Sequence, residues 1–450
     1  MFLKEIIEAS RGKTVGFKNI KICGISIDSR TIKKGEAFIA LEGNQFDGHD
    51  FVDKAFEKGA SCAIISRKIG KTKSRAILVP DTLRALGDIA RFHRLKFNIT
   101  VIAITGSAGK TTAKEIICHI LSKKYNVHKN EGTKNNLVGL PLTLLGLRPK
   151  HDMCIVEMGT NRPGEIKRLS DIARPQVGII TNIGPTHLEF LGDVKNVFKE
   201  KFDLLEALNE ESLAVLNADD NFLKKARAKG RTLYFGLERP CDFRAINIST
   251  KAGNISFTVG KYHFRAPLLG RHNVYNALVG IAVGKVFGIK TKDIAGLLSD
   301  FKNPFKDRLT WSKCGKIDVL NDSYNSNPLS FVNAIDSLES FSKKRRRIVI
   351  AGDMLELGKK SKRLHTEIGA RIAESGVKIF LATGKKSRHA CSGALKKGMK
   401  SVSVMYFDNQ EDLIKAMPKV LHKGDVVLVK GSRGTRMDRV AECLSNFSLK

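Results

Sequence analysis

Short runs of β-branched and other apolar residues alternate along this chain with amphipathic stretches and glycine-bearing turns. Strands that are buried on both faces of a parallel sheet produce such apolar runs, and the helices that cover the sheet produce the amphipathic stretches between them. The pattern therefore predicts an α/β fold with mostly parallel sheets.

The same pattern divides the chain into three blocks of expected strands. We expect domains at residues 1–82, 83–306 and 307–450, with a proline-containing segment at 301–306 as the second boundary. Expected strands lie at 23–27, 37–41, 63–66, 76–79, 153–157, 177–182, 213–217, 232–235, 317–321, 347–351, 378–382, 403–407 and 426–429, with a strand-rich piece at 243–264. Expected helices include 51–58, 82–95, 113–123, 194–208 and 273–287.

Composition places the chain among ordinary globular proteins, with 42% hydrophobic and 27% charged residues in 450. No apolar run approaches the ~20 residues that cross a bilayer, so we expect no membrane insertion. The first residues lack a basic start followed by an apolar core, which predicts an initial helix and no signal peptide. The eight cysteines show no Cys-x-x-Cys spacing, which favours free thiols and a cytoplasmic protein.

The net charge of +33 is the unusual bulk property. A strongly basic chain can bind nucleic acid, so a basic, nucleotide-dependent nucleic-acid-binding protein is one alternative. Lysine and arginine are spread along the whole length, however, and aromatic residues do not alternate with them as a stacking surface requires. The densest run, 343–347, precedes an apolar strand and is typical of a solvated loop. We therefore expect no nucleic-acid partner.

The most specific chemical signal is the segment Thr-Gly-x-x-Gly-Lys-Thr at 105–111, between an apolar run and a predicted helix. Glycines let the backbone wrap round phosphate oxygens, the helix N-terminus adds positive partial charge, and Lys110 adds a full charge. Ile104 stands where the general motif has its first glycine. The predicted phosphate ligands are Gly106, Ser107, Ala108, Gly109, Lys110, Thr111 and Thr112.

Two further segments of the central block follow expected strands. Glu157 ends the strand at 153–157, at the sheet edge where α/β proteins bind ligands, and could hold Mg²⁺ together with Thr111. His187 follows a Gly-Pro turn and is a candidate ligand, although a lone histidine is usually structural. The composition of 199–203 indicates only a solvated helical face.

Three polar segments of the last block also follow expected strands, at 321–328, 352–358 and 430–437. Polar turns are the simplest interpretation. Their place at the carboxyl ends of strands favours ligand loops, and the glycines, hydroxyls and cations of the last one could bind an anion.

Taken together, these segments resemble the Mur ligases, the ATP-dependent amide-forming enzymes of peptidoglycan synthesis. The resemblance spans essentially the whole chain and explains Ile104. It also rests on the segments 28–30, 46–49, 135–136 and 139–145. It implies a small N-terminal α/β domain for a UDP substrate, a central ATPase domain with a phosphate loop and a mostly parallel sheet, and a Rossmann-like C-terminal α/β domain.

The resemblance also implies individual roles. Catalytic roles fall to Lys110, His187 and Lys201. Two Mg²⁺ ions are expected, with Thr111 and Glu157 on one, His187 on the second, and a carbamate formed on Lys201 from CO₂ as a further ligand. The resemblance implies that ATP contacts Asn276, Arg308, Asp322 and Tyr324. It implies that the UDP end contacts Ser29, Arg30, Asp47 and His49. Further contacts with substrate fall to Asn135, Asn136, Asn325 and Asn327.

Within the family, the resemblance is strongest to members that join D-alanyl-D-alanine to the carboxylate of UDP-N-acetylmuramoyl-tripeptide through an acyl phosphate. We therefore expect these two substrates, ATP as the phosphate donor, and a monomer. Two neighbouring activities stay open: a ligase that adds the single third residue of the peptide, and folylpolyglutamate synthase.

Overall fold

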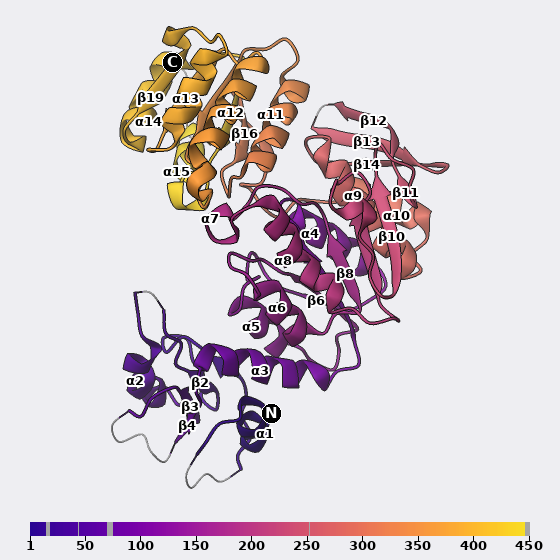
Figure 1. Ribbon diagram of the computed structural model, residues 1–450, viewed down its shortest axis with the longest axis vertical. Helices are drawn as coiled ribbons and strands as arrows, with labels where there is room; N and C mark the ends of the chain where they lie inside the picture. Colours follow the sequence, from indigo (N-terminus) through magenta and orange to yellow (C-terminus); the bar gives the residue numbers. More distant parts are fainter. Residues whose placement is uncertain (15–18, 44, 70–74, 252, 446–450) are drawn as a thin grey trace.

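The computed structural model describes residues 1–14, 19–43, 45–69, 75–251 and 253–445 (Figure 1). Three α/β lobes follow one another along the long axis of the molecule, with the N-terminal lobe at one end and the C-terminal lobe at the other. The α/β prediction is confirmed. Of the predicted blocks, residues 15–18, 44 and 70–74 of the first, residue 252 in the strand-rich piece of the second and residues 446–450 of the third lie outside the described residues.

The N-terminal lobe is built on a four-stranded parallel sheet in the order β1-β2-β3-β4. Its apolar core strands Ala37–Ile39 and Cys62–Ile65 are buried throughout, as the sequence pattern predicted. The elements are α1 (Leu3–Ser10), β1 (Ile25–Ser26), β2 (Ala37–Ile39), the 3₁₀ helix η1 (Gly48–Phe51), α2 (Val52–Glu57), β3 (Cys62–Ile65), β4 (Ala76–Leu78) and the connecting helix α3 (Thr82–Leu95).

The central lobe holds a seven-stranded parallel sheet in the order β11-β10-β9-β8-β5-β7-β6. Along β5, Val101 and Ala103 join the core on one face while Ile102 and Ile104 join the core on the other, because successive side chains of a strand point to opposite sides. The elements are β5 (Thr100–Thr105), α4 (Lys110–Leu121), β6 (Val127–Lys129), α5 (Gly139–Leu145), β7 (Met153–Glu157), α6 (Glu165–Ala173), β8 (Val177–Ile180), α7 (Leu188–Leu191), α8 (Val194–Glu206), β9 (Leu213–Asn217), η3 (Leu223–Lys225), β10 (Arg231–Gly236), β11 (Phe243–Arg244), α9 (His272–Val286) and α10 (Thr291–Ser299).

The predicted strand-rich piece divides between two sheets. β11 extends the parallel sheet, whereas β12 (Ile246–Lys251), β13 (Asn254–Val259) and β14 (Tyr262–Ala266) form a separate antiparallel sheet. Phe257 and Phe264 stack at 5.6 Å between ring centroids and are buried in the same core as α4 and α9. The small sheet therefore covers one side of the central lobe.

The C-terminal lobe has a six-stranded sheet in the order β15-β16-β20-β17-β18-β19. All neighbours are parallel except β15, an antiparallel edge strand that the sequence did not predict. The elements are β15 (Thr310–Cys314), β16 (Ile317–Asp322), α11 (Pro328–Ser342), β17 (Arg347–Ala351), η4 (Gly358–Lys360), α12 (Ser361–Glu374), β18 (Ile379–Thr383), α13 (Ser387–Lys396), η5 (Ser401–Ser403), β19 (Val404–Phe407), α14 (Gln410–Val420), β20 (Val426–Lys430), η6 (Arg433–Thr435) and α15 (Asp438–Ser445).

Two local expectations need correction. The helix after the phosphate loop begins at Lys110 and not at residue 113, because the loop closes directly into the first helical turn. The basic run 343–347 is not simply a solvated loop, since Arg345 pairs with Asp318 and Arg346 pairs with the buried Asp425 at 3.4 Å. Within the described ranges, every helix is too short or too polar to cross a bilayer.

Candidate active site

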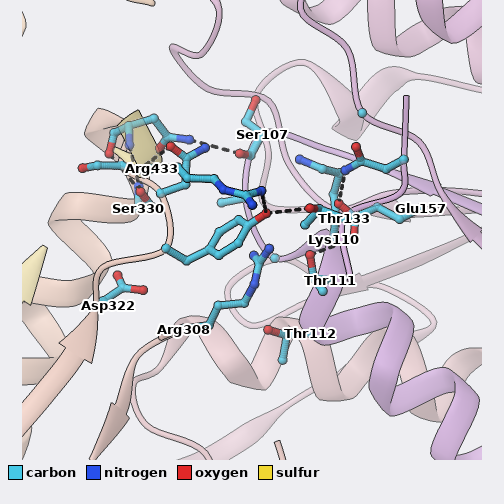
Figure 2. A pocket seen from close by; sticks show the side chains of 18 of the residues that line it. Ser107, Lys110, Thr111, Thr112, Thr133, Glu157, Arg308, Asp322, Ser330 and Arg433 are labelled. Atoms are coloured by element: carbon cyan, nitrogen blue, oxygen red, sulfur yellow. Dashed lines mark hydrogen bonds between the residues drawn. The ribbon is translucent and has the colours of Figure 1, made fainter. Parts of the chain in front are cut away.

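A cavity of about 450 Å³ lies between the central and C-terminal lobes. Figure 2 shows Arg433, Asp322 and Ser330 on one side of it and Thr133, Glu157 and Lys110 on the other. The carboxyl ends of β5, β7 and β16 all open toward it, as expected for parallel sheets. Predicted residues that line it are Ser107, Ala108, Gly109, Lys110, Thr111, Thr112, Asn135, Asn136, Glu157, His187, Asn276, Arg308, Asp322, Tyr324, Asn325 and Asn327.

The phosphate loop is held by the segment that follows β8. The Asn182 side chain accepts from the Ala108 N–H at 2.8 Å and donates to the Ala108 carbonyl at 3.0 Å. Gly109 has φ of +83°, and a Cβ there would lie 2.5 Å from Asn276 Oδ1. Only glycine fits both the left-handed backbone and this close approach.

The Lys110 ammonium donates to the Gly106 carbonyl at 2.7 Å. Burial lowers the pKa of Lys110, while the charge of Glu157 acts against that shift.

Glu157 is fixed at both of its carboxylate oxygens. The Thr111 hydroxyl donates to Oε2 at 2.7 Å, and the Asn135 amide donates to Oε1 at 2.7 Å. The carboxylate is only 2% exposed, so these bonds hold it in one orientation beside the phosphate loop. The predicted pairing of Thr111 with Glu157 is therefore present as geometry. A hydroxyl beside a carboxylate at the end of a phosphate loop is a donor set that Mg²⁺ prefers.

His187 precedes α7 and lines both the main cavity and a smaller one of about 190 Å³ beside it. Its Nδ1 lies 2.5 Å from Glu356 Oε2, a contact between the central and C-terminal lobes. Burial lowers the pKa of His187 although Glu356 acts in the opposite direction, and the bond to His187 lowers the pKa of Glu356.

Lys201 corrects the interpretation of 199–203 as a solvated face. Its side chain on α8 is 1% exposed and Glu200 is 5% exposed, whereas Lys199 is exposed. Glu200 accepts from the N–H groups of Gly164 and Ile166 at the start of α6, which explains its burial. Burial, with the charge of Lys110 nearby, holds the pKa of Lys201 well below its usual range.

An aromatic ring joins the two lobes on the other side of the cavity. The Arg308 guanidinium lies 3.9 Å from the centroid of the Tyr324 ring, and the Tyr324 hydroxyl donates to Thr133 Oγ1 at 2.7 Å. Arg433 donates to the same hydroxyl at 3.3 Å, as the dashed lines of Figure 2 show. Two cations therefore flank one ring that the family resemblance implies near the nucleotide.

Asp322 pairs with Lys430, whose ammonium lies 2.5 Å from Oδ2 and also donates to the Asn325 carbonyl at 3.0 Å. Burial raises the pKa of Asp322 even though Lys430 acts against it. The ion pair links the end of β16 to the end of β20 and shapes the 321–327 loop. Asn327, at the end of that loop, donates to the Ser107 carbonyl of the phosphate loop at 3.1 Å.

The residues predicted for the UDP end are in the N-terminal lobe and do not line this cavity. Arg30 forms a bidentate pair with Asp28, and Asp47 accepts from His49 Nδ1 at 2.6 Å. Ser29 and His49 are buried. Gly106 and Lys201 also lie outside the lining itself, the first within the phosphate loop and the second on α8.

Sequence reasoning did not name several lining residues. The sequence pattern places Glu356 inside a predicted ligand loop but does not link it to His187, and it places Lys430 and Arg433 in a predicted anion-binding segment. Ser326 lies inside the predicted ligand loop 321–328, whereas the pattern does not single out the remaining ones: Thr133, Gly159, Thr160, Asn161, Glu165, His272, Asn273, Leu309, Ser330, Asn333 and Ala334. The Asn-Arg-Pro-Gly turn after β7, which contains Asn161, was the one available signal.

The lining fits a nucleoside triphosphate with Mg²⁺. Among the described residues, Arg308 Nε and Ser326 Oγ are buried polar atoms of the lining without a hydrogen-bond partner. A buried donor is costly to leave unpaired, so such atoms indicate that a polar ligand enters the cavity. Lys110, Arg308 and Arg433 give the cavity the positive charge that phosphates require.

Comparisons with known proteins agree with this geometry. Models of the Mur ligase family catalytic domain, the Mur ligase middle domain and the Mur ligase glutamate ligase domain match residues 21–94, 104–284 and 307–433. The chain is 34% identical over 449 residues to the UDP-N-acetylmuramoyl-tripeptide--D-alanyl-D-alanine ligase of Bacillus subtilis, covering 98% of each chain. It superimposes on MurF from Acinetobacter baumannii with a TM-score of 0.90 at 29% identity, covering 99% and 98% of the two chains. It superimposes on MurF from Thermotoga maritima in complex with ADP with a TM-score of 0.85 at 28% identity, covering 95% and 98%.

Proposed function

The chain belongs to the Mur ligase family, and from that premise we propose that its cavity joins D-alanyl-D-alanine to UDP-N-acetylmuramoyl-tripeptide. The products are UDP-N-acetylmuramoyl-pentapeptide, ADP and phosphate, and the reaction belongs to peptidoglycan synthesis. One observation carries the proposal: the phosphate loop of one lobe and the 321–327 loop of the other line one cavity, in a chain related to such ligases along its full length.

The chemistry requires activation of a carboxylate. A carboxylate does not react with an amine near neutral pH, because the oxide that would have to leave is a poor leaving group. Attack of the tripeptide carboxylate on the γ-phosphate of ATP forms an acyl phosphate and releases ADP. The amine of D-alanyl-D-alanine then attacks the acyl carbon, and phosphate leaves as the amide bond forms.

The first step brings two anions together, so the cations of the cavity have a defined task. Lys110 neutralises the γ-phosphate from the phosphate loop, and Arg308 does so from the other lobe with its unpaired Nε. Thr111 and Glu157 would hold one Mg²⁺ and His187 would hold a second. Bound there, Mg²⁺ would withdraw charge from the phosphate oxygens.

The second step needs protection from water, because water would hydrolyse the acyl phosphate. The contacts of Tyr324 with Thr133 and of Asn327 with Ser107 hold the C-terminal lobe against the central lobe. The closed arrangement limits the access of water to the reacting carbonyl. Asn276 and Asp322 contact the nucleotide from opposite sides, and Asn135, Asn136, Asn325 and Asn327 orient the substrates.

Lys201 carries a carbamate formed from CO₂ in this proposal. Only an uncharged amine attacks CO₂, and the lowered pKa of Lys201 favours that form. The carbamate would place an anion beside Lys110, where a protonated Lys201 would place a second cation. It would also offer a further oxygen ligand on the metal side of the cavity.

The N-terminal lobe holds the UDP end through Ser29, Arg30, Asp47 and His49. Their distance along the molecule from the phosphate loop suits a long substrate whose peptide reaches into the cavity while its nucleotide stays outside.

The substrates and ATP are cytoplasmic metabolites, which supports a cytoplasmic location for the enzyme. A monomer remains our expectation.

Phosphate release with purified substrates tests the proposal. We expect turnover with UDP-N-acetylmuramoyl-tripeptide and D-alanyl-D-alanine together, and none when either is omitted. Turnover with single amino acids on the dipeptide substrate, or with glutamate on a folate, would favour the neighbouring ligase activities instead. Running the assay separately with diaminopimelate-containing and lysine-containing tripeptides shows which residue the enzyme accepts at the third position of the peptide.

A further inference from the structure

The 352–358 loop of the C-terminal lobe makes a two-point contact with the segment that carries His187. Glu356 Oε2 lies 2.5 Å from His187 Nδ1, and the Glu356 carbonyl accepts from the Glu189 N–H at 3.0 Å. The two partners are 169 residues apart in the chain. This contact therefore exists only when the two lobes meet.

The backbone on both sides is shaped for this contact. His187 and Glu356 have φ of +52° and +60°, a region that non-glycine residues rarely occupy. Gly358, with φ of +52°, lies so close to α7 that a Cβ there would be 2.9 Å from Glu189 Cα. Uncommon backbone conformations persist where the surrounding structure requires them, and here they aim the imidazole and the carboxylate at each other.

The contact decides which ring nitrogen of His187 faces a ligand. A neutral imidazole has one N–H and one bare nitrogen, and a carboxylate at Nδ1 draws the proton to Nδ1. Nε2 is then the nitrogen with a free lone pair. A carboxylate behind a ligating histidine fixes its ring orientation and raises its basicity in metal sites generally.

We propose that Glu356 is a positioning residue of the C-terminal lobe that fixes the tautomer and orientation of His187, so that His187 becomes a competent ligand only when the 352–358 loop docks on it. This inference rests on the proposed function for its consequence in catalysis. Its structural content, the Nδ1–H tautomer held across the two lobes, stands independently of which substrates the enzyme joins. Glu356 thereby couples closure of the lobes to assembly of the metal side of the cavity.

Nitrogen-15 spectra of histidine-labelled, metal-free protein test the structural half. We expect the His187 signals, assigned by their loss in His187→Gln, to show the Nδ1–H tautomer in the native protein. In Glu356→Ala they should shift toward the Nε2–H form. An Nε2–H tautomer in the native protein, or spectra that do not change in Glu356→Ala, would overturn the inference.

Steady-state kinetics test the functional half, with Glu374→Gln as the matched control, since Glu374 is an exposed carboxylate of the same lobe that pairs with Lys397 at 2.7 Å. We expect Glu356→Ala to lower kcat about 10- to 100-fold with the KM for ATP within about twofold, and Glu356→Gln to retain part of the rate because its amide oxygen still accepts a hydrogen bond. The control should keep the native rate.

A double-mutant comparison separates positioning from a general structural effect. If Glu356 acts through His187, the variant with both His187→Gln and Glu356→Ala should be no slower than His187→Gln alone. Additive losses, or an unchanged kcat in Glu356→Ala, would overturn the inference. Should the native enzyme show no ligase turnover at all, the proposed function fails while the tautomer measurement still decides the structural claim.

Discussion

Lys201 shows how much of this site depends on burial of single residues. Its neighbours in sequence are charged, yet the side chain is 1% exposed and within electrostatic reach of Lys110. A buried ammonium beside another cation is unfavourable, so the free amine is stabilised relative to the charged form. The same residue on an exposed helical face would stay protonated and would not react with CO₂.

Replacing Lys201 with methionine keeps the length and apolar stem of the side chain and removes the amine. We expect kcat to fall at least about 100-fold, a loss typical of an essential electrostatic group, while ATP still binds. Native protein equilibrated with ¹³C-bicarbonate should show a carbamate carbon signal that Lys201→Met lacks.

Lys199→Met is the matched control, because Lys199 is on the same helix but exposed. It should keep both the rate and the carbamate signal. A native spectrum without a carbamate signal, or full activity in Lys201→Met, would contradict the role given to Lys201.

Glu157 offers a second test at the residue scale. Glu157→Gln keeps hydrogen-bonding capacity toward Thr111 and Asn135 but removes the charge. We expect the Mg²⁺ concentration for half-maximal rate to rise by at least about tenfold, and Asn135→Ala to raise it less, since that change only loosens the carboxylate. An unchanged Mg²⁺ requirement in Glu157→Gln would mean that the carboxylate does not hold the ion.

The residue scale also shows what sequence can and cannot predict. The phosphate loop and Glu157 were predictable, because a strand, a turn and a helix are local and place each side chain within a few residues. The burial of Lys201 and the pairing of His187 with Glu356 were not, because both depend on elements that approach only in the folded chain.

At the scale of elements, the turn after β9 ties three parts of the central lobe together. Asp219 accepts from the N–H groups of Leu237 at 2.6 Å and Arg239 at 2.9 Å, and from the Tyr275 hydroxyl of α9 at 3.0 Å. Burial alone would raise the pKa of Asp219, but these donors outweigh it and lower the pKa. One carboxylate therefore anchors the strand pair β9 and β10 to a helix.

We expect Asp219→Asn to destabilise the protein by about 1.5–3 kcal/mol at pH 7, the range for hydrogen bonds to charged groups. A carboxyl with a lowered folded-state pKa stabilises the fold above its unfolded pKa of about 3.9 and loses that contribution as the pH falls through the folded value. The difference in urea midpoint between the native protein and Asp219→Asn should therefore stay constant above about pH 5. Below about pH 5 this difference should become smaller.

Glu238→Gln is the matched control for this change, because it removes a neighbouring exposed carboxylate that pairs with Arg271. It should change the free energy of unfolding by less than about 0.5 kcal/mol, as surface substitutions usually do. If the difference in urea midpoint between the native protein and Asp219→Asn becomes larger toward low pH, the carboxylate does not act through its charge.

The predictable elements were those that carry continuous apolar runs. β7, β9 and β17 coincide with their predicted bounds because all or nearly all of their residues are buried. β15 was missed because Cys314 is its one buried residue, so an edge strand of mostly polar residues leaves no apolar run. The division of 243–264 between two sheets likewise depends on pairing partners and not on local pattern.

At the scale of the whole molecule, the site exists only where two lobes meet. Tyr324, Asn327 and Glu356 each reach from the C-terminal lobe to a polar group of the central lobe. The resemblance to a known family implied that these loops share a site, but the residue pattern alone did not say which groups touch. Relative lobe placement follows from long-range packing, which no local sequence signal encodes.

Tyr324→Phe tests the contribution of these contacts to closure. It removes the hydroxyl that bonds Thr133 and Arg433 but keeps the ring against Arg308. A lost bond of about 1 kcal/mol lowers the ratio of closed to open molecules roughly fivefold, and the apparent affinity for a nonhydrolysable ATP analogue should weaken by up to that factor. Calorimetric titration measures this, with Tyr262→Phe, an exposed tyrosine of β14, as the control. Equal affinities in the native protein and in Tyr324→Phe would contradict a contribution of the Tyr324 hydroxyl to closure.

Transfer of oxygen from the tripeptide carboxylate to phosphate is the most direct test of the central claim. With ¹⁸O-labelled carboxylate in UDP-N-acetylmuramoyl-tripeptide, ATP and D-alanyl-D-alanine, we predict one ¹⁸O atom in the released phosphate for each pentapeptide formed. Phosphate without ¹⁸O, or phosphate released without pentapeptide, would contradict an acyl-phosphate ligase.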